Sequence, residues 1–208
     1  MIIAVDGPAA AGKGTIARAL AERFGFHFLD TGLLYRMVGH AMLEAGLDPA
    51  DPEAAIRAAE GLDPNRYAMT DLRAQAVADA ASLVAVIPEV RRALLGFQRD
   101  FARKPPGAVL DGRDIGTVVC PEATVKIFVT ATPEVRAERR ARELAEAGVP
   151  VDFPSVLAEI RTRDERDKKR LTAPLVPARD AYILDTSDMD VKEAVEKAAA
   201  AVEARRVR

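Results

Sequence analysis

The chain has 208 residues, enough for one sizeable hydrophobic core and a small inserted subdomain. Its 49% of apolar and 30% of charged residues are typical of a globular protein and argue against a disordered or fibrous chain. The formal net charge of −2 argues against a dedicated nucleic-acid-binding protein, and no apolar run approaches the roughly 20 residues of a membrane span.

A single cysteine, Cys120, excludes an internal disulfide framework and fits a reducing compartment. The first residues, MIIAVDG, lack the basic region and the long apolar stretch of a secretory signal. We therefore expect a cytoplasmic protein whose partners are small molecules, with no membrane and no nucleic-acid polymer among them. Nothing in the sequence indicates an obligate oligomer, so a monomer is expected.

Strand and helix patterns alternate along the chain. The predicted strands are the short apolar runs over 2–5, 27–29, 108–110, 125–129 and 182–184. The first predicted helix is an Ala-rich segment that follows the Gly-rich loop after residue 6. The further predicted helices cover 33–44, 74–83, 89–101, 133–147, 154–170 and 191–205. Residues 46–72 contain several Asp-Pro steps and little periodicity, so a loop with short elements is expected there. The alternation predicts an α/β fold with three layers around a parallel sheet of five strands.

The helix after the fourth strand has clear boundary signals. Thr132 is a suitable N-cap, Pro133 takes the first helical position and Glu134 lies in the first turn. Gly148 stands where the helix should end. These four residues predict the two ends of this helix.

The strongest motif is GPAAAGKGT, which lies between a predicted strand and a predicted helix. Glycines at its two ends let the backbone bend around a polyphosphate, and the following helix directs its N-terminal N–H groups at that anion. The residues expected to bind ATP are Gly7, Pro8, Ala9, Ala10, Ala11, Gly12, Lys13, Gly14 and Thr15. Lys13 supplies a positive charge that can follow the transferring phosphate.

This loop departs from the simplest phosphate-loop pattern at one position. Gly14 follows the lysine where that pattern has Ser or Thr, and the hydroxyl comes one place later, at Thr15. Thr15 is therefore the candidate in this loop for a role at Mg²⁺.

A GTP-dependent switch fits the sequence poorly. The single asparagine, Asn65, is followed by Arg66, so the chain has no N-K-x-D guanine-recognition motif. The arginines favour a small kinase instead, because phosphoryl transfer depends mainly on positioning and charge neutralisation. An acceptor that is itself a phosphate is largely ionised near neutral pH and needs no general base. This agrees with the two histidines, His27 and His40, which lie outside any catalytic motif.

The chain resembles the nucleoside monophosphate kinases, and within them the bacterial cytidylate kinases. The segments that carry the resemblance are GPAAAGKGT, LDTGLLYR (29–36), PEVRRALL (88–95), DGRDIGTVV (111–119), RDERDKKR (163–170) and APLVP (173–177). The resemblance implies a phosphate-loop fold that transfers the γ-phosphoryl group of ATP, with Mg²⁺, to CMP or dCMP. It also implies a core (1–35, 84–147 and 171–208), a nucleotide-binding insertion over about 36–83 and an arginine-rich lid over about 148–170.

The same resemblance assigns the acceptor site and the catalytic cations. CMP would be bound by Thr31, Arg36, Ser82, Arg91, Arg113, Asp114, Arg163, Asp167 and Arg170. The catalytic residues would be Lys13, Arg36, Arg113, Arg163 and Arg170. The resemblance implies that Arg36, Arg113, Arg163 and Arg170 contact phosphates and that Asp167 meets the sugar hydroxyls. Ser82 and Arg91 match positions that contact the cytosine ring in relatives, and Asp114 would help to recognise the same base. Asp111 would hold the metal through water, together with Thr15, and Arg139 and Arg136 are candidates for ATP contacts.

Residue patterns support part of this assignment independently. Arg36 follows a predicted strand by one helical turn, at the edge of the sheet where ligands bind in open α/β folds. Arg163, Asp167 and Arg170 have the spacing of one helix face, although a solvated helix with surface ion pairs has the same pattern.

Three alternatives to CMP phosphorylation stay open at this point. The segment over 47–73 is shorter than in many bacterial cytidylate kinases, which leaves UMP or AMP as possible acceptors. A kinase of a small hydroxylated metabolite would need a base for its alcohol group. A regulatory module would bind ATP without acceptor-dependent turnover.

Overall fold

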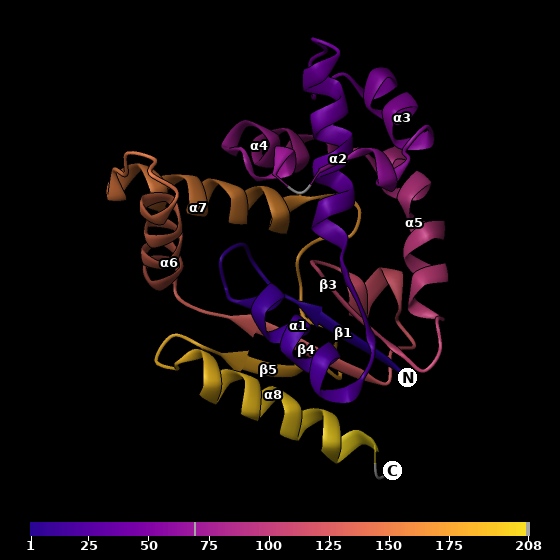
Figure 1. Ribbon diagram of the computed structural model, residues 1–208, viewed down its shortest axis with the longest axis vertical. Helices are drawn as coiled ribbons and strands as arrows, with labels where there is room; N and C mark the ends of the chain where they lie inside the picture. Colours follow the sequence, from indigo (N-terminus) through magenta and orange to yellow (C-terminus); the bar gives the residue numbers. More distant parts are fainter. Residues whose placement is uncertain (69, 207–208) are drawn as a thin grey trace. The chain divides into compact units, whose positions relative to one another are not determined.

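The computed structural model describes residues 1–68 and 70–206, which form two compact units (Figure 1). The sheet unit comprises Met1–Leu29 and Ala102–Arg208, and the helical unit comprises Asp30–Phe101. The strands are β1 (Ile2–Asp6), β2 (His27–Asp30), β3 (Ala108–Gly112), β4 (Val125–Thr130) and β5 (Tyr182–Asp185). They form one parallel sheet in the order β2-β3-β1-β4-β5, which confirms the predicted α/β class and its five strands.

The register of the sheet determines where the Gly-rich loop leaves it. β1 pairs in parallel with β3 on one side and with β4 on the other. The last residue of β1, Asp6, lies opposite Gly112 of β3 and Phe128 of β4. The loop after Asp6 therefore starts at the carboxyl edge of the sheet, between two strands whose own following loops begin at the same edge.

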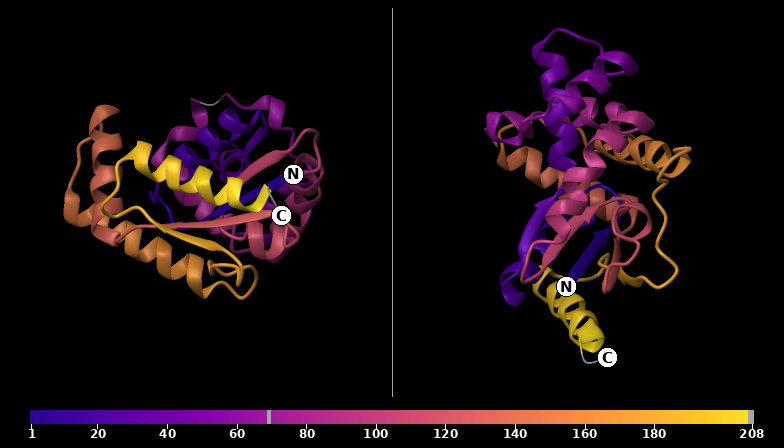
Figure 2. Two further views of the ribbon diagram at one scale, coloured as in Figure 1. Left: turned by 90° about the horizontal axis from the view of Figure 1, so that it is seen from below. Right: turned by 90° about the vertical axis from the view of Figure 1, so that its right-hand side faces the viewer.

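The hydrophobic core of the sheet unit lies between the sheet and two helices, α1 (Lys13–Phe24) and α8 (Val191–Arg206). Alternate residues of β1, Ile3 and Val5, belong to this core and are fully buried. Figure 2 shows α8 along this face from two further directions. Because side chains alternate along a strand, Asp6 projects from the opposite face. A short π-helical segment, η3 (Ile115–Val119), receives it there.

Two further helices of the sheet unit, α6 (Pro133–Glu146) and α7 (Phe153–Lys169), pack against each other. The predicted start of α6 is confirmed, since Thr132 Oγ1 accepts the backbone N–H of Val135 at 3.3 Å. Gly148 follows the helix with a φ of +73°, as the sequence predicts. Between the two helices, Ala137, Val156 and Ile160 form a small core against which the loop residues Ala9 and Ala10 pack. This contact joins the hairpin of α6 and α7 to the Gly-rich loop.

The helical unit has a core of its own. Its elements are α2 (Thr31–Glu44), α3 (Pro52–Glu60), the short η1 (Pro64–Arg66) and η2 (Asp71–Arg73), α4 (Gln75–Val84) and α5 (Pro88–Ala102), the last ending one residue beyond the unit. A Cβ atom on Gly39 of α2 would lie 2.8 Å from the backbone nitrogen of Ala81 in α4. Helices α2 and α4 therefore approach each other through small residues.

The sequence-based prediction underestimated the helical structure of one segment in this unit. Helix α3 occupies Pro52–Glu60, within the segment expected to be a loop with short elements. Its N-cap, Asp51, accepts the backbone N–H groups of Glu53 and Ala54, and proline takes the first helical position. The sequence contains these start signals, but the Asp-Pro step was interpreted as a break and not as a cap followed by the first helical residue.

Within residues 1–68 and 70–206, none of the helices combines the length and the apolar character that crossing a membrane requires.

Candidate functional site

The loop from Gly7 to Gly12 is fixed by backbone conformations that favour glycine. Gly7 has a φ of +150°, and a Cβ atom there would lie 2.0 Å from the carbonyl oxygen of Val129. Gly12 has a φ of +85°, and Ala10 takes the left-handed region with a φ of +57°. The close approach to β4 therefore excludes a side chain at Gly7, whereas Gly12 is required by conformation.

The first turn of α1 has features of an anion-binding site. No side chain caps α1 at Gly12. The first N–H groups of an α-helix point away from the helix at its positive end, so this end of α1 can receive an anion. Lys13 is the first helical residue, is buried and donates from Nζ to the carbonyl oxygen of Pro8 at 3.2 Å. The positive end of the helix and the lysine thus belong to the same short segment, as phosphate binding requires.

The structure gives a physical reason for glycine at position 14. A Cβ atom on Gly14 would lie 3.3 Å from Oδ2 of Asp111, the buried carboxylate in β3. The backbone of α1 therefore lies close to this carboxylate, while the Thr15 side chain belongs to an exposed residue of the first turn. Thr15 and Asp111 offer a hydroxyl and a carboxylate beside the loop, which are hard oxygen donors of the kind that Mg²⁺ prefers.

Asp6 holds the segment DGRDIGT in place and was missed by the sequence analysis. Its Oδ1 accepts the N–H of Ile115 and its Oδ2 the N–H of Gly116, both at 2.7 Å. Burial raises the pKa of Asp6 to about 6, with a further rise from the negative charge of Asp114, while the two N–H donors and Lys13 oppose this rise. Asp114 is itself buried and directly precedes η3, so Asp6 determines the backbone position of this candidate cytosine contact.

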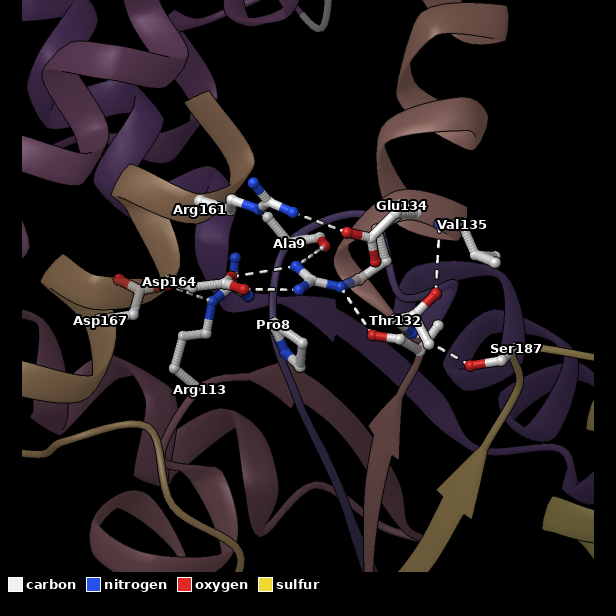
Figure 3. A network of polar contacts seen from close by, with 12 residues as sticks. Pro8, Ala9, Arg113, Thr132, Glu134, Val135, Arg161, Asp164, Asp167 and Ser187 are labelled. Carbon is white, nitrogen blue, oxygen red and sulfur yellow. Dashed lines mark hydrogen bonds and ion pairs between the residues drawn. The ribbon is translucent and has the colours of Figure 1, made fainter. Parts of the chain in front are cut away.

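A cluster of charged residues connects the loop after β3 with α7 (Figure 3). Arg113 donates from Nε to Oδ2 of Asp167 at 2.9 Å, and Arg170 Nη2 lies 3.9 Å from Oδ1 of the same carboxylate. Burial raises the pKa of Asp167, but Arg113, Arg170 and Arg163 together hold it below its usual range. Arg163 and Asp167 lie within α7, whereas Arg170 directly follows its last residue, Lys169, so the helix predicted over 154–170 ends one residue earlier. The shared role of these three side chains stays a prediction. Because Asp167 and Arg170 are buried, the alternative of a fully solvated helix face is wrong for them.

The two candidate arginines of α6 have different surroundings. Arg139 donates to the hydroxyl and the carbonyl oxygen of Thr186, and the Thr186 hydroxyl also lies 3.3 Å from the carbonyl oxygen of Ala11 in the loop. Arg136 is buried and donates to the carboxylate of Asp164 and to the carbonyl oxygens of Ala9 and Ala131. Arg136 is therefore committed to protein acceptors, whereas Arg139 lies beside the end of the loop.

The remaining candidate residues lie in the helical unit. Arg36 donates to the carbonyl oxygen of Leu72 at 2.7 Å. Arg91 donates to the carbonyl oxygen of Ala85 and places its guanidinium 5.4 Å from the ring centroid of Tyr35, the neighbour of Arg36. Two polar residues of this unit are buried: Thr31, at the start of α2, and Ser82, in α4.

The parallel sheet and the glycine-rich loop after β1 define the class of the protein as an α/β phosphate-loop fold. The chain matches a shikimate kinase structure from Bacteroides thetaiotaomicron with a TM-score of 0.51 and 14% identity, covering 98% of each chain, which supports the fold alone.

The family follows from the sequence comparison. The family model for cytidylate kinase matches residues 3–204. The chain is 63% identical over 196 residues to a cytidylate kinase of Paramagnetospirillum magneticum, covering 93% of each chain. It is 56% identical over 208 residues to one of Nitrobacter winogradskyi, covering 100% of this chain and 98% of the relative. The chain therefore belongs to the cytidylate kinase family.

Proposed function

We propose that this protein transfers the γ-phosphoryl group of ATP to CMP or dCMP, giving CDP or dCDP and ADP in pyrimidine nucleotide metabolism. Membership of the cytidylate kinase family over nearly the whole chain supports this reaction. The structural observation that carries the proposal is the phosphate loop, in which an uncapped helix N-terminus and the buried Lys13 share one segment. The alternative acceptors UMP and AMP and the non-catalytic module are not favoured.

ATP would bind along the loop from Gly7 to Thr15. The backbone N–H groups at the start of α1 would receive the phosphate oxygens, and Lys13 would exchange its contact with Pro8 for the transferring phosphate. Arg139 would contact ATP from α6, since it lies beside Thr186 and the end of the loop. Each of these groups carries positive charge or partial positive charge toward the phosphates, which lowers the barrier by electrostatic stabilisation.

Mg²⁺ is proposed to accompany ATP. Asp111, through water, and Thr15 would hold it, which fits their oxygen donors and the glycine that brings α1 close to Asp111. The ion, when bound, neutralises charge on the phosphate oxygens. This assignment rests on the chemistry and placement of the two side chains.

The acceptor nucleotide would be bound through its phosphate, its base and its sugar. Arg36, Arg113, Arg163 and Arg170 are proposed to contact phosphates. Thr31, Ser82, Arg91 and Asp114 are proposed to contact the nucleoside, and Asp167 its sugar hydroxyls. A carboxylate such as Asp114 can accept a hydrogen bond from the cytosine amino group. An acceptor phosphate is already ionised near neutral pH, so the arginines need only position it and neutralise its charge.

Closure of the lid would exclude water, because an open site would lose ATP to hydrolysis. We propose the lid over about 148–170, the acceptor-binding insertion over about 36–83, and the core in the remaining residues. The helical unit, Asp30–Phe101, contains the whole proposed insertion. A monomer and a cytoplasmic location are proposed as well, the second because a single cysteine, Cys120, allows no internal disulfide and fits a reducing compartment.

The experiment that tests the proposal offers acceptors one at a time. ADP release from ATP and Mg²⁺ is measured with CMP, dCMP, UMP, AMP, GMP and shikimate. Strong turnover with CMP and dCMP alone is expected. Equal turnover with UMP or AMP would overturn the assigned specificity, and ATP binding without acceptor-dependent turnover would overturn the kinase assignment.

A further inference from the structure

A buried ion pair lies between the phosphate loop and the lid helix, outside the residues proposed to touch either nucleotide. Arg136, in the first turn of α6, donates from Nη1 to Oδ1 of Asp164 at 3.0 Å and from Nη2 to its Oδ2. The side chains are only 3% and 9% exposed. A two-pronged contact between a planar guanidinium and a carboxylate fixes both groups in orientation as well as in distance.

The same guanidinium is bound to two backbone segments of the site. Arg136 Nη1 also donates to the carbonyl oxygen of Ala9, within the loop, at 3.2 Å. Its Nε donates to the carbonyl oxygen of Ala131, just after β4, at 3.0 Å. One side chain therefore connects the loop, the end of a core strand and, through Asp164, helix α7. Figure 3 shows Ala9 and Asp164 bound within one network of polar contacts.

Asp164 is placed between the residues with which α7 is proposed to bind the acceptor. It directly follows Arg163 and precedes Asp167 by three positions, which is nearly one helical turn. The apolar contacts of Ala9 and Ala10 with Val156 and Ile160 lie one to two turns earlier on the same helix. These contacts hold α7 near the loop, but they are not directional. The ion pair adds a directional contact between α7 and this loop, as the bond from Arg113 to Asp167 does between α7 and the loop after β3.

We infer that Arg136 and Asp164 are positioning residues that set the lid helix in register with the phosphate loop. This inference rests on the proposed kinase reaction and adds two residues that touch neither nucleotide. Their removal should misplace Arg163, Asp167 and Arg170 relative to the loop. A displacement of about 1 Å can lower turnover by about 100-fold.

The chain offers a matched control between the same two helices. Arg161 of α7 donates to Glu134 of α6 at 2.7 Å, and these side chains are 59% and 51% exposed. This pair also links α6 to α7 but makes no contact with the loop among the described hydrogen bonds. If any ion pair between the two helices were sufficient to position α7, Arg161→Ala and Asp164→Asn would change kcat and KM to a similar extent. Exposed pairs contribute little to stability, so Arg161→Ala should keep the parent values of kcat and KM.

The decisive variant is the double substitution Arg136→Met with Asp164→Leu. Replacing a buried ion pair with apolar residues of similar size often leaves a fold as stable as before, so the variant should remain folded. It removes the contact with Ala9 as well as the pair. We expect a Tm near that of the parent, a kcat about 10-fold to 100-fold lower and a larger share of ATP hydrolysed without transfer to CMP. Asp164→Asn keeps one acceptor oxygen, so its kcat should lie between those of the parent and of the double variant.

A stable double variant with the parent kcat and KM would overturn the inference, because the pair would then be purely structural. If the double variant does not fold, Asp164→Asn decides by the same criterion at a temperature below its Tm. Hydrogen exchange of the amides at 9–12 provides a readout that needs no turnover: at least about 10-fold faster exchange is expected in the variant, and unchanged exchange counts against the inference. Failure of the proposed function would appear separately, as a parent protein without acceptor-dependent ADP release.

Discussion

The carboxylate of Asp6 accepts the backbone N–H of Gly116 at 2.7 Å, which joins the end of β1 to the loop that follows β3. Its second oxygen accepts the N–H of Ile115 at the same distance. A Cβ atom on Gly116 would lie 3.3 Å from Asp6 and 3.1 Å from Lys126, so the loop is closely packed against the sheet. The residue that precedes the phosphate loop therefore also fixes the segment that contains Arg113 and Asp114.

This buried carboxylate predicts a distinct pH dependence of stability. Because burial raises the pKa of Asp6 from 3.8 to about 6, its contribution to stability is complete below pH 3.8 and is lost as the pH rises through 6. Asp6→Asn removes this titration. The difference in unfolding free energy between parent and Asp6→Asn should fall by at most about 3 kcal/mol between pH 4 and pH 7. Urea titrations across this range measure it, and a difference that is independent of pH would contradict the raised pKa.

Asp167 should show the opposite dependence. Its pKa is raised by burial but lowered more by Arg113, Arg170 and Arg163, so its stabilising contribution is present above pH 3.8 and is lost as the pH falls through its lower pKa in the folded state. Asp167→Asn leaves Arg113 without its carboxylate partner and should cost about 3 kcal/mol of unfolding free energy at pH 7. The loss of unfolding free energy caused by Asp167→Asn should become smaller as the pH falls and the parent carboxylate is protonated.

A matched control for this substitution lies on the same helix. Glu165 forms an exposed ion pair with Lys169 at 2.8 Å, and Glu165→Gln should leave stability essentially unchanged. Equal losses for Asp167→Asn and Glu165→Gln would show that the buried cluster adds nothing beyond a surface ion pair.

Two glycines with positive φ should respond differently to alanine. Gly25→Ala places its Cβ in open space at a φ of +66° and should cost about 1 kcal/mol of unfolding free energy. Gly7→Ala adds a contact of 2.0 Å with the Val129 carbonyl oxygen, so the loop must move. We expect ATP affinity, measured by calorimetry, to fall at least about 10-fold for Gly7→Ala alone. Parent affinity in that variant would mean that the loop geometry is not required for ATP binding.

Asp114 tests the proposed recognition of the base. If its carboxylate accepts a hydrogen bond from the cytosine amino group, Asp114→Ala should lower the ratio of kcat/KM for CMP to that for UMP by about 10-fold or more. The KM for ATP should stay near the parent value, since the phosphate loop is unchanged. An unaltered CMP preference in the variant would remove Asp114 from the base contacts.

The main elements of the fold could be predicted because their signals are local. All five strands were placed with their ends short by a residue or two, since apolar runs identify the buried part of a strand and not its polar end. Thr132 and Pro133 gave the start of α6 for the same reason. Helix α3 was missed because an Asp-Pro step marks both a turn and a capped helix start, and only packing of Ala54, Ala55 and Ala59 decides between them.

The candidate site also contains residues that local sequence patterns predict and residues that only the fold brings together. The phosphate loop and the grouping of Arg163, Asp167 and Arg170 follow from spacing within one segment. Asp6 and Ile115 are separated by 109 positions, and Arg136 and Ala9 by 127, so no periodicity could link them. A polar residue at the end of a buried strand was the one available signal for Asp6. The buried pairing of Arg136 needed the arrangement of α6, α7 and the loop.

The most direct test of the central claim follows the transferred phosphate itself. The protein is incubated with Mg²⁺, CMP and ATP labelled in its γ-phosphate, and the products are separated. Label in CDP, in an amount equal to the ADP formed, is the predicted result. Label released only as inorganic phosphate, whether or not CMP is present, would contradict phosphoryl transfer to a nucleotide and with it the proposed function.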